Sequence, residues 1–304
     1  MRSIMKKVLY LFQFSALIAF PTAVNSYADI CANPKNEWLF CDDFESGTLT
    51  SNGWYYNIPG GTYFPSPPAP SASITNAEAF SGSRSMMAIY QPGDAGAAAR
   101  AHHQVAPSQQ VYVRYYRLFE NSWIFNPNRP MHSTYLFAGT YVSPTTTDLT
   151  VYEDNDGNTQ KTNLTVKSSY QNNLIVPPNI SYILNSYPIM PHNVAAPPSV
   201  IPGQWVCIEY MVKLNTAGQQ DGEIKLWVND ILVTDLQNLV LRDSSHADIL
   251  IDHFLFGPNY PPSGPTQVQR NYIDALVIST SRIGSMLPSG PLSPPANLRI
   301  VPAR

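Results

Sequence analysis

Residues that can move a proton lie close together on segments with the alternating pattern of β-strands. Arg114 and Tyr116 share one side of "QVYVRYYRLF", His132 precedes "STYLFAGTYV", and Tyr135 lies near the start of that second segment. Tyrosine and histidine can remove and return a proton, and arginine can neutralise a carboxylate as negative charge develops. The sequence therefore predicts an acid–base site in which Tyr135 or His132 exchanges protons and Arg114 binds negative charge.

Other aromatic and polar residues are candidates to contact a substrate beside that site. Exposed aromatic rings can stack on sugar faces, and a few polar groups fix the orientation of a ligand. The substrate-binding candidates are Trp227, Trp123, Tyr116, Glu209, Lys225 and His253. Trp205 is expected in the core instead. His102 and His103 could lie on strands next to that of His253, and a hydrogen-bonded structural role is the competing interpretation for every histidine.

The acidic segment "VYEDNDGNTQ" could hold a metal ion or form a turn. It contains Glu153, Asp154 and Asp156, and its Asp-x-Asp-Gly pattern is a fragment of a calcium loop without the later glutamate. An Asp-Gly hairpin turn accounts for the same pattern. We therefore predict a turn, no metal site and no cofactor, with Ca²⁺ as the alternative.

The first 28 residues have the features of a signal peptide. Lys6 and Lys7 precede the apolar run "VLYLFQFSALIAF", and Ser26-Tyr27-Ala28 offers the small-x-small pattern that signal peptidase reads. The run is shorter than the roughly 20 apolar residues of a transmembrane helix. We therefore predict a secreted or periplasmic protein that has no membrane span and starts near Asp29.

Export changes the interpretation of the three cysteines. Cys31 and Cys41 enclose a short loop, so a disulfide between them is the simplest pairing in an oxidising compartment. Cys207 lies in the apolar segment "WVCIEYMV", whereas catalytic cysteines need an accessible, electropositive setting. We predict that Cys207 is a buried free thiol.

The composition favours one β-rich domain. The chain has 28 prolines among 304 residues and only 13% charged residues, so we expect many turns and few exposed helices. Residues 29–285 are predicted to form the domain, and residues 286–304 a proline-rich tail. A net charge of -3 provides no basic field, which excludes nucleic acid as a partner. We expect a monomer.

Alternation with period two recurs along the chain and predicts two packed sheets. In the hairpin around "NTAGQQDG", Ile208 and Tyr210 point to one side, while Cys207 and Glu209 point to the other. A sheet with one apolar and one mixed face suits a two-sheet sandwich. Tyr170–Pro202 is predicted to be an ordered, proline-rich flap. The predicted strands are Gln110–Phe119, Ser133–Val142, Thr162–Tyr170, Gln204–Leu214, Gly222–Asp230 and Asn271–Thr280.

An ordered set of segments carries a family resemblance. The set comprises "LFCDDFESG", "GSRSMMAIY", "VYVRYYRLF", "PGQWVCIEYMVKLNTAGQQDGEIKLWVNDILV" and "NYIDALVIST". It resembles the concanavalin A-like lectin/glucanase jelly roll and, within that superfamily, bacterial polysaccharide-lyase-like proteins. The resemblance implies an all-β, two-sheet antiparallel jelly-roll sandwich. It also implies that Asp42, Asp43 and Glu45 lie at the end of the first strand with structural roles, with Ca²⁺ binding and catalysis as alternatives.

The resemblance leaves the activity open, because the superfamily contains hydrolases, lyases and lectins. The E-x-D-x-x-E pattern of laminarinase-type hydrolases is missing, and the R-x-E, Q-x-H and Y-x-K-x-G-x-Y signatures of alginate lyases are not intact. We expect a lyase-like enzyme that cleaves an acidic polysaccharide by β-elimination in the groove of the jelly roll. A noncatalytic carbohydrate-binding or adhesion module is the alternative, and an inert protein whose face is covered by Tyr170–Pro202 is a third.

Processing of the leader gives a first test. We expect the exported protein to lack residues 1–28 and to begin at Asp29, because the small residues before it are those that signal peptidase reads. Intact mass and N-terminal sequencing of the exported protein check this. A mature chain that still carries Lys6 and Lys7 would contradict the prediction.

Overall fold

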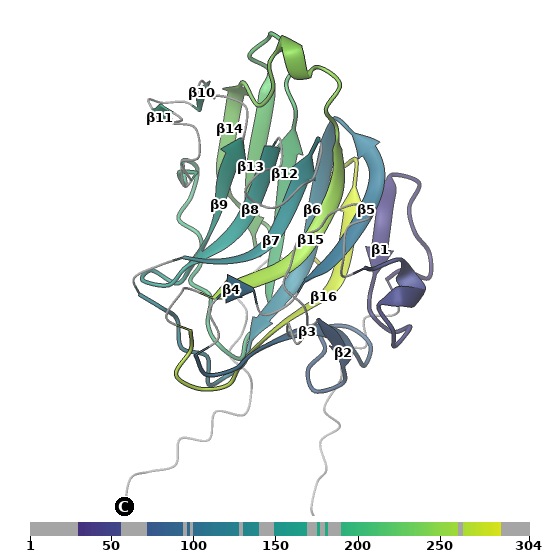
Figure 1. Cartoon of the computed structure of the whole chain (residues 1–304), viewed down its shortest axis with the longest axis vertical. Coiled ribbons are helices and arrows are strands. Elements are labelled where there is room, and N and C mark those ends of the chain that lie inside the picture. Colours follow the sequence, from purple (N-terminus) through teal and green to yellow (C-terminus); the bar gives the residue numbers. More distant parts are fainter. Residues whose placement is uncertain are drawn as a thin grey trace, which may run out of the picture.

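Two antiparallel β-sheets pack face to face and form the body of the molecule (Figure 1). The computed structural model describes residues 30–55, 72–93, 96–97, 100–127, 130–139, 149–168, 175–176, 180–181, 190–260 and 264–286. The arrangement confirms the predicted all-β, two-sheet antiparallel sandwich. The predicted signal peptide and the tail beyond Met286 lie outside the described residues. Within the described residues, no helix is long and apolar enough to cross a membrane.

Sheet A, the larger sheet, has the strand order β14-β13-β12-β6-β16-β3-β2, and β1 pairs with β16. Its strands are β1 (Trp38–Asp42), β2 (Ser73–Thr75), β3 (Ser85–Tyr90), β6 (Gln110–Phe119), β12 (Val206–Lys213), β13 (Gly222–Val228), β14 (Ile231–Leu239) and β16 (Gln269–Ser279).

Sheet B has the order β4-β15-β7-β8-β9, and β5 pairs with β15. Its strands are β4 (Gly96–Ala97), β5 (Ala101–Ser108), β7 (Met131–Ala138), β8 (Leu149–Asp156), β9 (Lys161–Ser168) and β15 (Ile251–Tyr260). Two short strands, β10 (Ile175–Val176) and β11 (Ile180–Ser181), pair with each other, and the 3-10 turns are η1 (Thr50–Asn52) and η2 (Ser244–His246).

The six predicted strands are present, but the sequence patterns did not predict several others. Gln110–Phe119 coincides with β6, and the other five overlap β7, β9, β12, β13 and β16 with shifted ends. Glu153, Asp154 and Asp156 of β8 were predicted to lie in a turn, because an Asp-Gly hairpin pattern ends this segment. The prediction is wrong for Glu153 and Asp154, which lie within the strand and have partners on neighbouring strands.

The predicted sorting of the hairpin faces is confirmed. Ile208, Tyr210 and the apolar residues of β13 belong to the core between the sheets. Tyr116 and Cys207 form a separate cluster on the other side of sheet A. Alternation along each strand therefore gives sheet A one face toward the core and one outward face.

A buried ion pair connects the two sheets. The Arg117 Nη1 of β6 donates to the two carboxylate oxygens of Glu153 on β8, at 2.6 and 2.7 Å, and both side chains are fully buried. The same guanidinium donates to the hydroxyls of Ser133 on β7 and Thr162 on β9, and Tyr115 Oη donates to Glu153 at 2.8 Å. One arginine of sheet A thus holds three neighbouring strands of sheet B.

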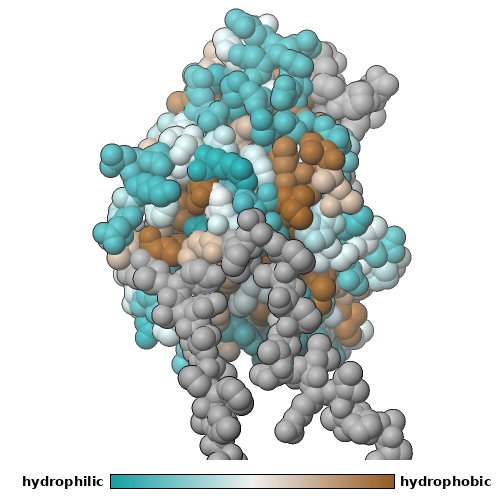
Figure 2. Space-filling model, turned by 180° about the vertical axis from the view of Figure 1, so that it is seen from behind, coloured by the Kyte–Doolittle hydropathy of each residue, from teal (hydrophilic) through white to brown (hydrophobic). Residues whose placement is uncertain are grey.

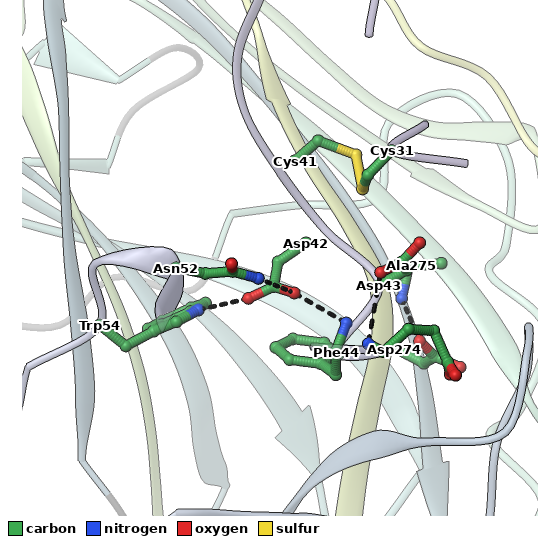
Figure 3. The surroundings of a disulfide bond; sticks show 10 residues. Cys31, Cys41, Asp42, Asp43, Phe44, Asn52, Trp54, Asp274 and Ala275 are labelled. Carbon is green, nitrogen blue, oxygen red and sulfur yellow. Dashed lines mark hydrogen bonds between the residues drawn. A yellow bond between two sulfur atoms is a disulfide. The ribbon is translucent and has the colours of Figure 1, made fainter. Parts of the chain in front are cut away.

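The N-terminal segment confirms the predicted disulfide. Cys31 and Cys41 are bonded, with their Cα atoms 5.6 Å apart (Figure 3). Cys207 is free and buried, and burial raises the pKa of its thiol to about 11. It is therefore a poor nucleophile, as predicted.

The acids after Cys41 have structural roles, as the resemblance implied. Asp42 accepts hydrogen bonds from Phe44 N, Asn52 Nδ2 and Trp54 Nε1, at 2.6 to 2.8 Å (Figure 3). Glu45 accepts from the backbone N–H groups of Ser83 and Arg84. Asp43 accepts from Glu45 N. These bonds fix the turn that leaves β1.

The described end of the predicted flap links the edges of the two sheets. Met190 N donates to Leu164 O on β9, and Val194 N donates to Val233 O on β14. Val200 is buried in the core and is bonded to the turn that precedes β9. Apart from β10 and β11, residues 170–189 of the predicted flap lie outside the described residues.

The buried ion pair gives a stability test. Arg117→Met should reduce the free energy of unfolding by about 3–5 kcal/mol, because it leaves Glu153 buried without its cation. The double variant Arg117→Met/Glu153→Leu should recover most of this loss, since no unpaired charge remains. Urea denaturation of both variants measures the difference. Equal losses in the single and double variants would contradict the prediction.

Candidate active site

The candidate site lies on the outward face of sheet B, the side of this sheet turned away from sheet A. The inward side chains of β7, β8 and β15, such as Leu136, Val151 and Phe254, belong to the core. Alternate residues form a separate cluster on the other side of the sheet, and its members are Tyr135, Phe137, Tyr152 and Leu255. Polar residues on the same side of these strands can therefore meet a ligand together.

His132 and Asp154 form an ion pair on this face. They are cross-strand neighbours on β7 and β8, and His132 Nδ1 is hydrogen-bonded to Asp154 Oδ1. The other oxygen, Asp154 Oδ2, accepts from Thr165 Oγ1 of β9 at 2.5 Å. Burial opposes the charge of the ring, but the Asp154 carboxylate outweighs this effect and raises the pKa of His132.

A second group of proton-carrying residues lies toward β5. His102 Nδ1 is 3.0 Å from His253 Nε2, and Tyr55 Oη is 3.3 Å from the His253 ring nitrogens. The prediction that His102 and His253 lie on neighbouring strands is confirmed by the pairing of β5 with β15. Burial lowers the pKa of His102 to about 3 and that of His253 to about 4, so both rings are neutral near pH 7.

A row of rings connects the two groups. Neighbouring centroids along it are 4.9 to 5.9 Å apart, and His132 stacks against its last member at 5.1 Å. In order across the strands the row consists of Tyr55, His102, His253, Phe137, Tyr135 and Tyr152. Five of the six rings are buried, and only Tyr55 is partly exposed, so most of the row is packed within the face of the sheet.

Exposure differs along this row. Phe137, Tyr152 and His102 are buried, whereas the His132 side chain remains 28% exposed. Lys167, on the same side of β9 as Thr165, is also buried. The imidazole of His132 is therefore the part of the acid–base group that solvent and a ligand reach most directly.

The structure does not bring Arg114 to this site. His132 and Tyr135 lie on the outward face of sheet B, but Arg114 of β6 lies on the outward face of sheet A, on the opposite side of the sandwich. Its guanidinium carbon is 5.4 Å from the Tyr116 ring. The sequence placed these residues together because adjacent segments looked like adjacent strands, yet β6 and β7 belong to different sheets.

Four predicted substrate contacts also lie on the outward face of sheet A, and the protein's own chain engages three of them. Glu209 accepts from the N–H groups of Ile283 and Gly284, at 2.7 and 3.0 Å, and Tyr116 Oη accepts from Met286 N. Arg282 lies 4.7 Å from the Trp227 ring centroid. The fourth residue, Lys225, lies 3.5 Å from both Glu223 and Asp235. The segment after β16 thus covers the predicted contacts around β12.

Trp123 and Trp205 exchange their predicted positions. Trp123 was predicted to contact substrate, but it is buried in the core between Tyr90, Phe119 and Phe125. Trp205 was predicted in the core, but it is partly exposed and packs against the outward cluster of sheet A. The two residues are of the same type, and only the packing of the folded chain distinguishes their environments. His253 is the predicted contact that does lie on the outward face of sheet B.

Sequence reasoning missed several residues of this face. Tyr152, Thr165 and Lys167 were not selected, and Asp154 was assigned to a turn. Alternation in "LTVYEDND" was the available signal, because it places Tyr152 and Asp154 on one side and Glu153 on the other. Asp156, at the end of β8, does make the predicted turn, accepting from Asn158 N and Thr159 Oγ1. Within the described ranges, no cluster of three His, Cys, Asp or Glu side chains is placed to bind a metal.

Comparisons with known proteins define the class of this fold. Residues 199–263 match the family model described as Polysaccharide lyase 14. A search of curated protein sequences finds no match. Because the matched residues are less than half of the chain, they show a local similarity that covers β12 to β15.

Solved structures show the same sandwich. An alginate lyase from a Chlorella virus is 14% identical with a TM-score of 0.53, and the alignment covers 68% of this chain and 88% of that chain. An alginate lyase from Aplysia kurodai is 15% identical with a TM-score of 0.51, covering 69% and 87%. A protein described as cellulose induced protein is 17% identical with a TM-score of 0.51, covering 81% and 99%. The chain has the jelly-roll fold of these proteins, and the resemblance to polysaccharide-lyase-like proteins is confirmed at the level of fold.

The neutral histidines predict a pH dependence of stability. Their folded pKa values lie below the ordinary value of 6.5, so the unfolded chain binds protons that the folded chain does not. The stabilisation is complete above about pH 6.5 and is lost as the pH falls toward 4. Between pH 7 and pH 4, the free energy of unfolding should therefore fall by roughly 2 kcal/mol less in His253→Gln than in the wild type.

Urea denaturation at pH 7, 5 and 4 measures this difference. His246→Gln, which changes a histidine on η2 outside the sheets, is the matched control. If the wild type and His253→Gln lose stability in parallel, His253 is not the neutral buried group described above.

Proposed function

We propose that this chain is an exported, lyase-like enzyme that cleaves an acidic polysaccharide by β-elimination on the outward face of sheet B. The observation that carries the proposal is the group formed by His132, Asp154 and Tyr135 at one end of a row of rings, where the His132 side chain is 28% exposed and the other two residues are buried. The ring centroids of His132 and Tyr135 are 6.1 Å apart. The local similarity to a polysaccharide lyase family and the shared fold support the same class of activity.

β-Elimination requires one group to take a proton and another to give one. The C–H bond on the carbon next to the uronate carboxylate breaks, and a carbon–carbon double bond forms. The bond from carbon to the glycosidic oxygen breaks, and this oxygen leaves with a proton. Tyr135 is proposed as the base. His132, whose pKa is raised by Asp154, is proposed as the acid that protonates the leaving oxygen and as a positive charge beside the developing enolate.

Arg114 has no part in the site proposed on sheet B. The face of sheet B has its own cationic groups, since Lys167 lies on β9 beside Thr165 and Arg100 immediately precedes β5. The charge of Arg100 helps to lower the pKa of His102, after burial and His253, which places its guanidinium near this face. Arg100 is partly exposed and suits a polymer that carries carboxylates, whereas Lys167 is buried.

A noncatalytic carbohydrate-binding module is the second candidate. Such a module requires no proton transfer, and the partly exposed ring of Tyr55 suits stacking on a sugar. Binding of a polymer without formation of an unsaturated product would support this alternative.

The proposed setting of the protein is a secreted or periplasmic location, with a monomer as the proposed state. The Cys31–Cys41 disulfide fits an oxidising compartment, which supports a secreted or periplasmic location. Seen from behind, the hydrophobic areas form separate patches among hydrophilic ones (Figure 2). A monomer is the proposed state, and the described residues of this face show no continuous apolar area of the kind that obligate interfaces have. Polysaccharide remains the proposed partner.

The activity test uses variants on the two opposite faces. We expect purified mature protein to release unsaturated uronides, detected by ultraviolet absorbance, from at least one acidic polysaccharide of a panel. Tyr135→Phe and His132→Gln should each reduce kcat by at least about 100-fold, because each removes a proton-transfer group. Lys225→Gln, on the outward face of sheet A, should retain full activity.

Three results would contradict the proposal in different ways. Activity that survives in both site variants would keep the reaction and reject the residues. Activity that is lost in Lys225→Gln would return the site to sheet A. Retardation by a polysaccharide in an affinity gel, without release of product from any polymer, would favour the binding module.

A further inference from the structure

We propose that Asp154 is a positioning residue that holds His132 as an imidazolium and turns its Nε2–H toward the substrate. This inference rests on the proposed function, because it assigns the role of a neighbour to the proposed acid. It also makes a claim about the protonation of His132 that can be measured without any substrate.

The first support is the set of bonds around Asp154. One carboxylate oxygen is bonded to His132 Nδ1 and the other to Thr165 Oγ1, and the residue is only 1% exposed. A carboxylate with both oxygens occupied has little freedom to rotate. Because Nδ1 is directed at Asp154, Nε2 is the nitrogen left for a substrate oxygen.

The second support is the local geometry of β7. The register between β7 and β8 shifts between His132 and Thr134, so an irregularity lies at the proposed acid. Ser133 turns inward and accepts from Arg117 Nη1, while His132 turns outward to Asp154. Such irregularities commonly re-aim a side chain next to an active site. The ring then lies against Tyr152, with an interplanar angle of 27°.

The third support is that side chains along β8 alternate between the two sides of sheet B. Glu153 and Asp154 are adjacent acids, but their carboxylates point to opposite sides of sheet B. Glu153 is held inward by Arg117 and Tyr115, which fixes the strand so that Asp154 must face outward. The buried pair therefore determines the orientation of the acid that contacts His132.

The charged and titratable groups around His132 come from three strands. They are Tyr135 on β7, Tyr152, Glu153, Asp154 and Asp156 on β8, and Lys161 and Lys167 on the side of β9 that carries Thr165. Asp154 is the group in direct contact with the ring. Burial acts against the charge of His132, and the charges of Asp154 and Glu153 favour it.

The decisive experiment is an NMR titration of the histidine Cε1–Hε1 resonances in wild type and Asp154→Asn. Asparagine keeps the size of the side chain and can still accept from Thr165, but it carries no charge. We expect the pKa of His132 to fall by at least about one unit, because an opposite charge in contact with a titrating group shifts its pKa by about 1–3 units. Thr165→Val, which removes only the second bond of Asp154, should give a smaller shift in the same direction.

The surface pair formed by His246 and Asp243 provides a matched control. His246 Nδ1 is 2.7 Å from Asp243 Oδ1, and both residues lie outside the sheets. The resonance of His246 should be the same in Asp154→Asn as in the wild type. Asp243→Asn should leave His132 and the activity unchanged.

The pH profile separates positioning from a purely structural role. If protonated His132 is required, kcat/KM falls as the pH rises through the pKa of His132. In Asp154→Asn this decline should begin at least about one unit lower, and Asp154→Glu should restore part of the profile. A profile that stays in place although the pKa of His132 has fallen would overturn the positioning role.

The outcomes also separate this inference from the proposed function. A pKa of His132 that does not change in folded Asp154→Asn overturns the inference, whatever the activity of the protein. If no polymer is cleaved but the pKa falls as expected, the proposed reaction fails while Asp154 still sets the charge of His132. Far-ultraviolet circular dichroism confirms that each variant is folded.

Discussion

The structure depends on one buried ion pair. Arg117 reaches from sheet A to Glu153 of sheet B, and its guanidinium also bonds to Ser133 and Thr162 on the two strands beside β8. Two charges removed from water are tolerated only where geometry and additional hydrogen bonds compensate for the lost hydration. Tyr115 Oη supplies one of those bonds, so the pair is specific for one register of the sheets.

This pair and the candidate site are two sides of the same strand. Because side chains alternate along β8, fixing Glu153 inward places Asp154 outward, where it meets His132. The same arginine bonds to Ser133, the residue next to His132. The positions of the proposed acid and its carboxylate partner are therefore set from behind, by contacts inside the sandwich, before any substrate is present.

The outward faces of the two sheets differ in the contacts that their polar side chains make. On sheet A, the carboxylate of Glu209 binds two backbone N–H groups of the segment that follows β16, and Arg282 packs over Trp227. Those side chains satisfy one another within the protein. On sheet B, rings join the hydrogen-bonded pair of His132 and Asp154, in which the carboxylate raises the pKa of His132, to the neutral pair of His102 and His253. Opposite pKa shifts on one face are the arrangement expected where proton transfer and ligand binding occur together.

The structural role of Asp42 was implied by the family resemblance, whereas the sequence patterns by themselves determined the two-sheet β class, the faces of the β12–β13 hairpin and the Cys31–Cys41 disulfide. These features depend on alternation and short-range contacts, which a linear pattern records. It also selected His132, Tyr135 and His253, although their roles remain predictions. Only the tertiary structure decided that β6 and β7 belong to different sheets, which separates Arg114 from His132. It alone assigned Trp123 to the core and made Asp154 a strand residue. The physical reason is that the partner of a buried charge or ring is chosen by contacts between distant segments, and spacing along the chain does not encode them.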